Sequence, residues 1–223
     1  MVEVIVFAEG QSEEQFIKRV VAPPLNHLQI YMKAQTLPTS KRGSGGAVSF
    51  DRLRFYARNA LRQYPGATLT TFLDLYGLDS DFPSFEEAKK IPLVHDRVQV
   101  LENALCEAIV AEVGCRLDRF LPHIQPYEFE GLLFSDVSAL SMTEPDWQVE
   151  LPALQEIRAE FETPEHINNS YETKPSKRLE DLLLPEYKKT RHGPLAAQRV
   201  TLSKMEAECP HFRAWVAKLR LLA

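Results

Sequence analysis

The stretch VIVFAEGQSEEQF, Val4 to Phe16, decides the fold that we expect for this chain of 223 residues. It begins with a continuous apolar, β-branched run, which is typical of a strand buried on both faces of a parallel sheet. The run ends at Glu9 and Gly10, and the residues that follow predict a helix, with Ser12 as its N-cap in a capping box with Gln15. We expect that helix to stop at Pro23-Pro24.

Strand-like and helix-like patterns continue to alternate after this stretch. Residues 28–37, 67–74 and 119–127 have the composition of strands, residues 50–64 and 94–113 have the spacing of amphipathic helices, and the chain beyond about residue 140 is mostly helical in pattern. This order predicts an α/β fold with a mostly parallel, doubly wound sheet, whose ligands bind at the carboxyl ends of the strands. We divide it into an α/β domain over 1–140 and a helical part over 141–223 packed on it, with a single domain as the alternative.

The composition is that of an ordinary globular chain, with 44% hydrophobic and 26% charged residues. No apolar run is long enough to cross a bilayer, and the N-terminus lacks the pattern of a secretory signal. Three scattered cysteines indicate a reducing compartment, and the six histidines show no HxxxH spacing, so each is expected to be structural. We therefore expect a cytoplasmic protein that does not contact a membrane.

The net charge of −5 conceals a strong asymmetry along the chain. Residues 1–71 carry +4, residues 72–173 carry −15 and residues 174–223 carry +6. Carboxylates gathered for a metal between basic segments gathered for phosphate would explain this pattern, and so would a solvated acidic face. The charges alone leave both interpretations open.

Two of the predicted central strands end on a carboxylate, Glu9 and Asp74. If these strands are neighbours, both carboxylates reach one cleft, and Glu13, one helical turn beyond Glu9, can point back into it. Carboxylates in a first helical turn also complement the helix dipole, and we favour that role for Glu14. Acids at strand ends without a basic residue nearby in sequence are typical ligands of a hard cation such as Mg²⁺ or Mn²⁺.

The segments FAEGQSEEQF (7–16) and TTFLDLYGLDSDFP (70–83) resemble TOPRIM domains, in which an E-G turn ends the first strand and a D-x-D ends the third. Together with PYEFEGLLFSD, PSKRLEDL and CPHFRAW they resemble a TOPRIM-like bacterial family that is still carried as a domain of unknown function. The E-G-x-[ST]-E spacing of the related overcoming-lysogenization-defect nucleases falls on Glu9, Gly10 and Glu13. The resemblance implies a TOPRIM/Rossmann-like sheet of four parallel strands and a Mg²⁺ (or Mn²⁺) site for phosphodiester chemistry. It also implies a partner ATPase of the ABC or SMC type, often in phage defence.

One position departs from the TOPRIM pattern, because Tyr76 stands where D-x-D has its second aspartate. Asp79 or Asp81 could replace that acid, although turn formation and capping are their more common roles. After the fourth predicted strand, Glu128 and Glu130 fall where related nucleases carry another metal-binding acid, and we prefer Glu128. We therefore predict Glu9, Asp74 and Glu128 as catalytic residues and add Glu13 as a metal ligand, with one or two metals left open.

Basic residues near the C-terminal end are candidates for nucleic-acid binding. Lys177 and Arg178 lie at the start of a predicted helix that Ser176 would cap, a favourable site for phosphate, and Lys188 extends the basic strip. Solvated helix charges are the alternative. The glycine-rich loop at 41–46 lacks the G-K-[ST] of a P-loop, so the chain itself should not hydrolyse ATP.

Three function classes follow from these observations. The first is a metal-dependent nuclease acting on DNA or RNA together with a partner ATPase. The second is a non-catalytic partner or regulator of an ATPase, and the third is a receiver domain phosphorylated on Asp74, which lacks the paired acids after its first strand. The strandedness of the substrate, the trigger of activity and the presence of a homo-oligomer are not determined by the sequence.

Overall fold

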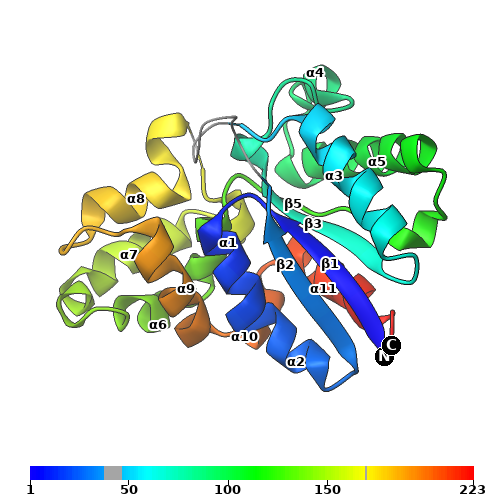
Figure 1. The fold of residues 1–223 in the computed structure, drawn as a ribbon. Coiled ribbons are helices and arrows are strands. Elements are labelled where there is room, and N and C mark those ends of the chain that lie inside the picture. Colours follow the sequence, from blue (N-terminus) through cyan, green and yellow to red (C-terminus); the bar gives the residue numbers. More distant parts are fainter. Residues whose placement is uncertain (38–46, 169) are drawn as a thin grey trace.

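The fold is built on a parallel sheet with the strand order β2-β1-β3-β4, in which β5 also pairs with β3 (Figure 1). The computed structural model describes residues 1–37, 47–168 and 170–223, so the glycine-rich loop predicted at 41–46 lies outside the described residues. The strands are β1 (Val2–Ala8), β2 (Ile30–Thr36), β3 (Thr68–Asp74), β4 (Phe120–Leu121) and β5 (Ile124–Gln125).

The two strands that carry the predicted acids are neighbours. Val4–Ala8 of β1 pairs in parallel with Thr68–Phe72 of β3, and the other edge of β1 pairs in parallel with β2. All described strand pairs are parallel, which confirms the expected α/β class with a mostly parallel sheet. The carboxyl ends of β1 and β3 therefore meet at one edge of the sheet.

The fourth strand position is split into two short pieces because Pro122 has no N–H for the ladder. The hydroxyl of Thr71 on β3 fills the gap, since Thr71 Oγ1 accepts from the His123 N–H and donates to the His123 carbonyl, both at 2.9 Å. This arrangement holds His123 beside the middle of β3.

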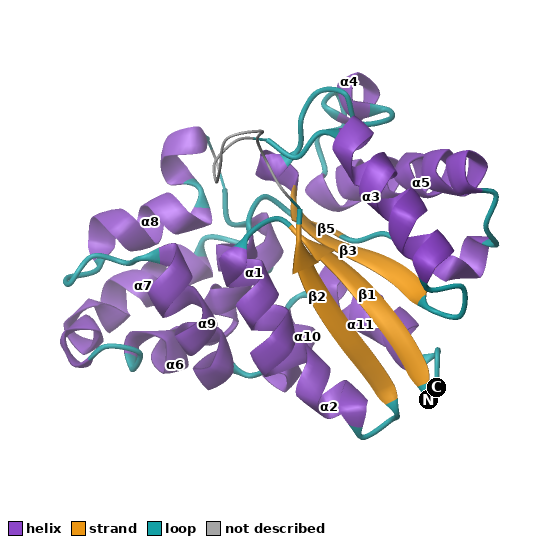
Figure 2. Ribbon diagram, in the orientation of Figure 1, coloured by secondary structure: helices purple, strands orange, loops and turns teal. Residues whose placement is uncertain are grey.

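Helices cover both faces of the sheet (Figure 2). On one face, Ile5 and Phe7 of β1 pack with α3 and α5, and on the other, Val4 and Val6 pack with α1, α9 and α11. The α-helices are α1 (Gln11–Phe16), α2 (Ala22–Asn26), α3 (Phe50–Gln63), α4 (Phe85–Ala88), α5 (Val94–Val113), α6 (Val137–Ser141), α7 (Leu151–Ala159), α8 (Pro175–Leu182), α9 (Lys189–Val200), α10 (Leu202–Glu208) and α11 (Pro210–Arg220).

The first helix departs from the prediction at both ends. Gly10 is its N-cap, and the predicted cap Ser12 lies buried inside α1. The helix also does not stop at the prolines, because a π-helical turn, Ile17–Val21, leads directly into α2. Pro23 and Pro24 lie in the first turn of α2, the part of a helix that tolerates proline best.

The C-terminal helices complete the core rather than extending away from it. Trp215 of α11 is buried and donates from Nε1 to Thr70 Oγ1 on β3 at 2.8 Å. Buried residues of α7, α9, α10 and α11 share one hydrophobic cluster with those of β1. The boundary at residue 140 stays a prediction. In the described part of the chain, no helix has the length and apolar character needed to span a bilayer.

Candidate active site

Five carboxylates and one lysine converge at the carboxyl ends of β1 and β3. Glu9 follows β1, Glu13 lies in α1 and Asp74 is the last residue of β3. The 3₁₀ helix η4 (Phe129–Asp136) contributes Glu130, Glu128 is its N-cap, and Lys189 is the first residue of α9. Contacts of α9 with α1 and with η4 bring these segments together.

Lys189 is the centre of this group, which we call the acidic cluster. Its Nζ lies 3.0 Å from Glu13 Oε1, 3.2 Å from Asp74 Oδ2 and 3.5 Å from Glu130 Oε2. The three carboxylates are at most 4% exposed, whereas the lysine side chain keeps 34% of its surface exposed. One flexible ammonium group thus compensates three buried acids.

Two oxygens of the acidic cluster have ion-pair contact with Lys189 but no hydrogen bond. Glu13 Oε1 and Glu130 Oε2 are buried without a hydrogen-bonding partner among the described residues. The other carboxylate oxygens are better satisfied: Asp74 Oδ1 accepts from the Phe129 N–H at 2.8 Å, and Glu130 Oε1 accepts from the Tyr187 hydroxyl at 3.3 Å. Buried polar atoms left without a partner call for an explanation, and an ion is one of the usual ones.

Glu9 is held against the backbone after β3. Its Oε2 accepts from the Asp74 N–H at 3.3 Å. A Cβ added at Gly77 would collide with the Glu9 carboxylate, so the glycine in the Asp74–Gly77 turn makes room for it. Glu9, Glu13 and Asp74 are therefore brought together as the sequence predicted.

Glu128 lies at the edge of the acidic cluster and makes its polar contacts outside it. Its Oε1 lies 2.8 Å from Lys174 Nζ, and its Oε2 accepts from the Ser176 N–H at 3.0 Å. Ser176 is not the N-cap of α8, which is Lys174. The start of α8, predicted as a phosphate site, thus binds the protein's own Glu128 carboxylate, as the helix dipole favours.

The three predicted phosphate-binding residues lie in different surroundings. Lys177 pairs with Asp181 at 2.5 Å on the surface of α8. Arg178 donates from Nε to the Thr173 carbonyl at 2.6 Å and packs over the Phe161 ring, with 14% of its side chain exposed. Lys188 is exposed directly before Lys189.

The loop after β3 does not supply the missing second aspartate. Asp81, which is distant from α3 in sequence, caps that helix by accepting a hydrogen bond from the Phe50 N–H at 2.8 Å. Asp79 accepts a hydrogen bond from the Ser80 N–H at 2.6 Å. Tyr76 packs against Tyr127. Asp74, 3% exposed, is not presented for phosphorylation, which argues against the receiver alternative.

Burial shifts the protonation equilibria of the acidic cluster. It raises the pKa of Asp74 well above its ordinary value and also raises the pKa of Glu9, although Lys189 opposes both shifts. The pKa of Glu130 rises from 4.5 to about 7, again mainly through burial. The acids in turn hold the pKa of Lys189 well above its ordinary value, so the ammonium stays charged. Such perturbed groups in one place are typical of functional sites.

The raised pKa of Glu130 predicts how stability depends on pH. The folded state binds this proton more tightly than the unfolded state, so the stabilisation is complete below about pH 4.5 and is lost as the pH rises through about 7. Glu130→Gln keeps an acceptor for Tyr187 but carries no charge. Above pH 7 we expect this variant to be more stable than the wild type, by on the order of 3 kcal/mol.

Chemical denaturation of both proteins across this pH range measures the difference. It should shrink toward pH 4.5, because both side chains are then neutral. A constant difference at all pH values would show that Glu130 titrates normally.

Sequence reasoning missed two members of the acidic cluster. The sequence does not predict Lys189 as a site residue, and it favours Glu128 over Glu130 as a metal-binding acid. No local sequence signal identifies Lys189, which is far from Asp74 in the chain. The opposite charges of residues 72–173 and 174–223 are only a weak indication that the two segments meet. The full burial of Glu130 follows from η4, whose apolar residues all face the core.

Comparison with known proteins gives one match. Neither the curated proteins nor the solved structures contain a significant match to the chain. The model of a family described as a domain of unknown function, DUF4276, matches residues 8–220, which include every residue of the acidic cluster. The chain therefore belongs to the DUF4276 family.

Proposed function

We propose that this protein is a Mg²⁺-dependent nuclease of the TOPRIM type that hydrolyses phosphodiester bonds in DNA or RNA. The observation that carries the proposal is the acidic cluster, in which two buried carboxylate oxygens have no hydrogen-bonding partner in the described part of the chain. The resemblance of FAEGQSEEQF and TTFLDLYGLDSDFP to TOPRIM segments supports the same assignment, as does the position at the carboxyl ends of neighbouring parallel strands. A partner ATPase and a role in phage defence belong to the proposal on that resemblance alone.

The residues present fit a hard divalent cation. Glu9, Glu13 and Asp74 supply carboxylate oxygens, which Mg²⁺ prefers as ligands. The positively charged Lys189 Nζ already lies 3.0 Å from Glu13 Oε1 and 3.2 Å from Asp74 Oδ2, so this place suits a cation. The lysine side chain is long and partly exposed, so it can withdraw toward solvent when a metal ion binds. When bound, Mg²⁺ would make a coordinated water a better nucleophile and offset charge on the phosphate.

The protein's own groups would then act as follows. Glu9, Glu13 and Asp74 hold the cation, with Asp74 oriented by the Phe129 N–H. Glu130 Oε2 is placed to accept a proton, because its pKa of about 7 matches neutral conditions. Lys189, once separated from the acids, offers its charge to a phosphate oxygen. Glu128 joins this chemistry only if its ion pair with Lys174 opens.

A cleavage assay tests the proposal. Single- and double-stranded DNA and RNA are incubated with the full chain and Mg²⁺ or Mn²⁺, with Asp74→Asn prepared in parallel. We expect cleavage that requires the metal and is lost in the variant. Metal-independent cleavage, or equal cleavage by both proteins, would contradict the proposal.

One observation favours the second candidate, a non-catalytic regulator of an ATPase. Lys189 already compensates three buried acids, as would be expected in a site that had replaced its metal by an ammonium group. The regulator predicts no metal binding at the acidic cluster and no effect of Mg²⁺ on stability.

Nucleic-acid binding by the basic residues is also testable. Lys188 is exposed and has no described internal ion pair, whereas Lys177 and Arg178 pair with residues of this chain. We expect Lys188→Ala to lower the slope of log affinity against log salt by about 0.7–0.9, and Lys177→Ala to change it much less. Fluorescence anisotropy of labelled oligonucleotides at several salt concentrations measures both slopes. A larger change in Lys177→Ala would reverse the assignment.

A further inference from the structure

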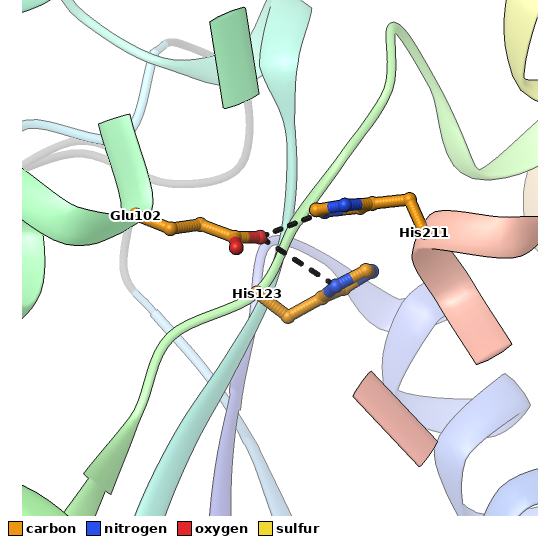
Figure 3. Close-up of side chains that lie close together, drawn as sticks. All are labelled: Glu102, His123 and His211. Carbon is orange, nitrogen blue, oxygen red and sulfur yellow. Dashed lines mark hydrogen bonds and ion pairs between the residues drawn. The ribbon is translucent and has the colours of Figure 1, made fainter. Parts of the chain in front are cut away.

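A second group of polar side chains lies away from the acidic cluster, where α5, the connection between β4 and β5, and α11 meet (Figure 3). It consists of Glu102, His123 and His211, whose side chains point toward one another. Glu102 Oε1 lies 2.8 Å from His211 Nε2 and 3.7 Å from His123 Nδ1. One ligand atom from each residue lies within 4.8 Å of the other two.

We propose that Glu102, His123 and His211 bind a divalent transition-metal ion of the zinc class. A tetrahedral ion with bonds of about 2.0–2.1 Å keeps its ligand atoms about 3.3 Å apart. The observed separations of 2.8 and 3.7 Å bracket that spacing, so small side-chain movements suffice. Two histidines and a carboxylate suit Zn²⁺, Co²⁺ or Ni²⁺, whereas Mg²⁺ prefers all-oxygen sites such as the acidic cluster.

One ring nitrogen of His123, Nδ1, is directed at the Glu102 carboxylate, 3.7 Å from Oε1. Its Nε2 lies 3.2 Å from Gln125 Oε1, an acceptor, so we assign the proton of the neutral ring to Nε2. Its Nδ1 lone pair then faces Glu102 Oε1, and a cation between them turns a repulsive contact into an attractive one.

The surroundings resemble the outer shell of a metal site. Gln125 orients His123, and the Ile124 N–H donates to Glu102 Oε1 at 2.8 Å, which fixes the carboxylate. Hydrogen bonds of this kind set the tautomer and direction of ligands in metal proteins. Glu102 and His123 are 3% and 1% exposed, so their orientation is also fixed by packing.

A surface pocket lies beside these residues, next to His211. A pocket of about 280 Å³ is lined by His95, His166 and Pro210, among others. The His95 ring lies 4.6 Å from that of His166 and 6.0 Å from that of His211. His95 Nε2 lies 3.1 Å from the buried Glu165 carboxylate, so His95 lines the pocket rather than completing the ligand set.

Without a metal, the same three residues would be a buried hydrogen-bond network. In that case the contact of 2.8 Å between His211 Nε2 and Glu102 Oε1 is a hydrogen bond. The two accounts differ in whether the protein takes up one equivalent of zinc at this place. Three protein ligands would leave the fourth coordination position of a tetrahedral ion open to a water molecule, as in catalytic zinc sites.

The experiment titrates the full chain, stripped of transition metals and held in excess Mg²⁺ to occupy the acidic cluster, with Zn²⁺ and, separately, with Co²⁺. We expect one equivalent of Zn²⁺ to bind and Co²⁺ to give the visible absorption of a tetrahedral site. His211→Gln should weaken Zn²⁺ binding beyond the roughly 10–100-fold typical of losing an outer-shell partner. His95→Gln, the matched control, and Asp74→Asn should bind Zn²⁺ as the wild type does.

The following results would contradict the proposal. The absence of stoichiometric Zn²⁺ binding, or of the Co²⁺ absorption, in the wild type leaves only the hydrogen-bond network. Equal binding by His211→Gln, or lost binding in Asp74→Asn, places the ion elsewhere. If His211→Gln does not fold, the Co²⁺ spectrum of the wild type still decides, and Glu102→Gln replaces the variant. Because Asp74→Asn is included, failure here is separable from failure of the nuclease proposal.

Discussion

Replacing Lys189 with methionine should destabilise the metal-free protein by about 3 kcal/mol at neutral pH, the cost of removing one partner from a buried ion pair. The substitution leaves Glu13, Asp74 and Glu130 without their shared ammonium group, which lies 3.0–3.5 Å from them. Mg²⁺ should restore much of this loss, because a divalent ion replaces the missing charge. The melting temperature should therefore rise more with Mg²⁺ in Lys189→Met than in the wild type.

Lys177→Met is the matched control for this measurement. It also removes a lysine from an ion pair, with Asp181, but on the exposed surface of α8, where such pairs contribute about 0–1 kcal/mol. Its melting temperature should stay close to that of the wild type with and without Mg²⁺. A Lys189→Met protein that is as stable as the control and ignores Mg²⁺ would show that the acids are neutral and bind no cation.

Neutralising the acids at the strand ends should have the opposite effect on stability. Glu9→Gln and Asp74→Asn remove a charge from a buried, acid-rich site, so the metal-free variants should melt at a higher temperature than the wild type. The amide of Asp74→Asn can still accept from the Phe129 N–H. Nuclease activity should fall at least about 100-fold, because a metal ligand is lost.

Melting curves and cleavage assays on the same preparations test this pair of effects. Asp118→Asn, which changes an exposed acid paired with Arg116, is the control and should alter neither. Variants that melt lower than the wild type in the absence of metal would identify Glu9 and Asp74 as structural residues. The regulator would then be the better description of the protein.

The sheet edge that carries these acids was predictable because its evidence is local. The apolar runs before Glu9 and Asp74 predict buried parallel strands, and β1 and β3 are indeed adjacent. Glu13 follows from helical geometry, one turn after Glu9. The pattern of α5 is similarly local: the helix ends before Gly114, whose φ of 67° is the left-handed conformation that glycine adopts readily after a helix.

The charge asymmetry has a structural explanation that neither sequence interpretation contained. Several side chains of the acidic segment 72–173 form ion pairs with side chains of the basic segment 174–223, either buried or at the surface. Lys174 meets Glu128, Arg191 meets Glu144, and Lys189 enters the acidic cluster. Composition shows that the two segments are complementary, but only the fold determines which residues meet.

The histidines illustrate the same limit. The absence of HxxxH spacing excludes two ligands on one face of a single helix, but it says nothing about ligands from separate elements. His123 and His211 come from the β4–β5 connection and α11, and their rings stack 5.0 Å apart. Contacts between residues so distant in the chain depend on the tertiary fold and leave no periodic pattern.

Calorimetric titration of the metal-free protein with Mg²⁺ tests most directly whether the acidic cluster is a metal site. We predict one or more saturable sites in the wild type that disappear in Asp74→Asn and persist in His211→Gln, which alters only the proposed zinc site. No saturable binding by the wild type, or binding that Asp74→Asn retains unchanged, would contradict the account and leave Lys189 as the permanent partner of these carboxylates.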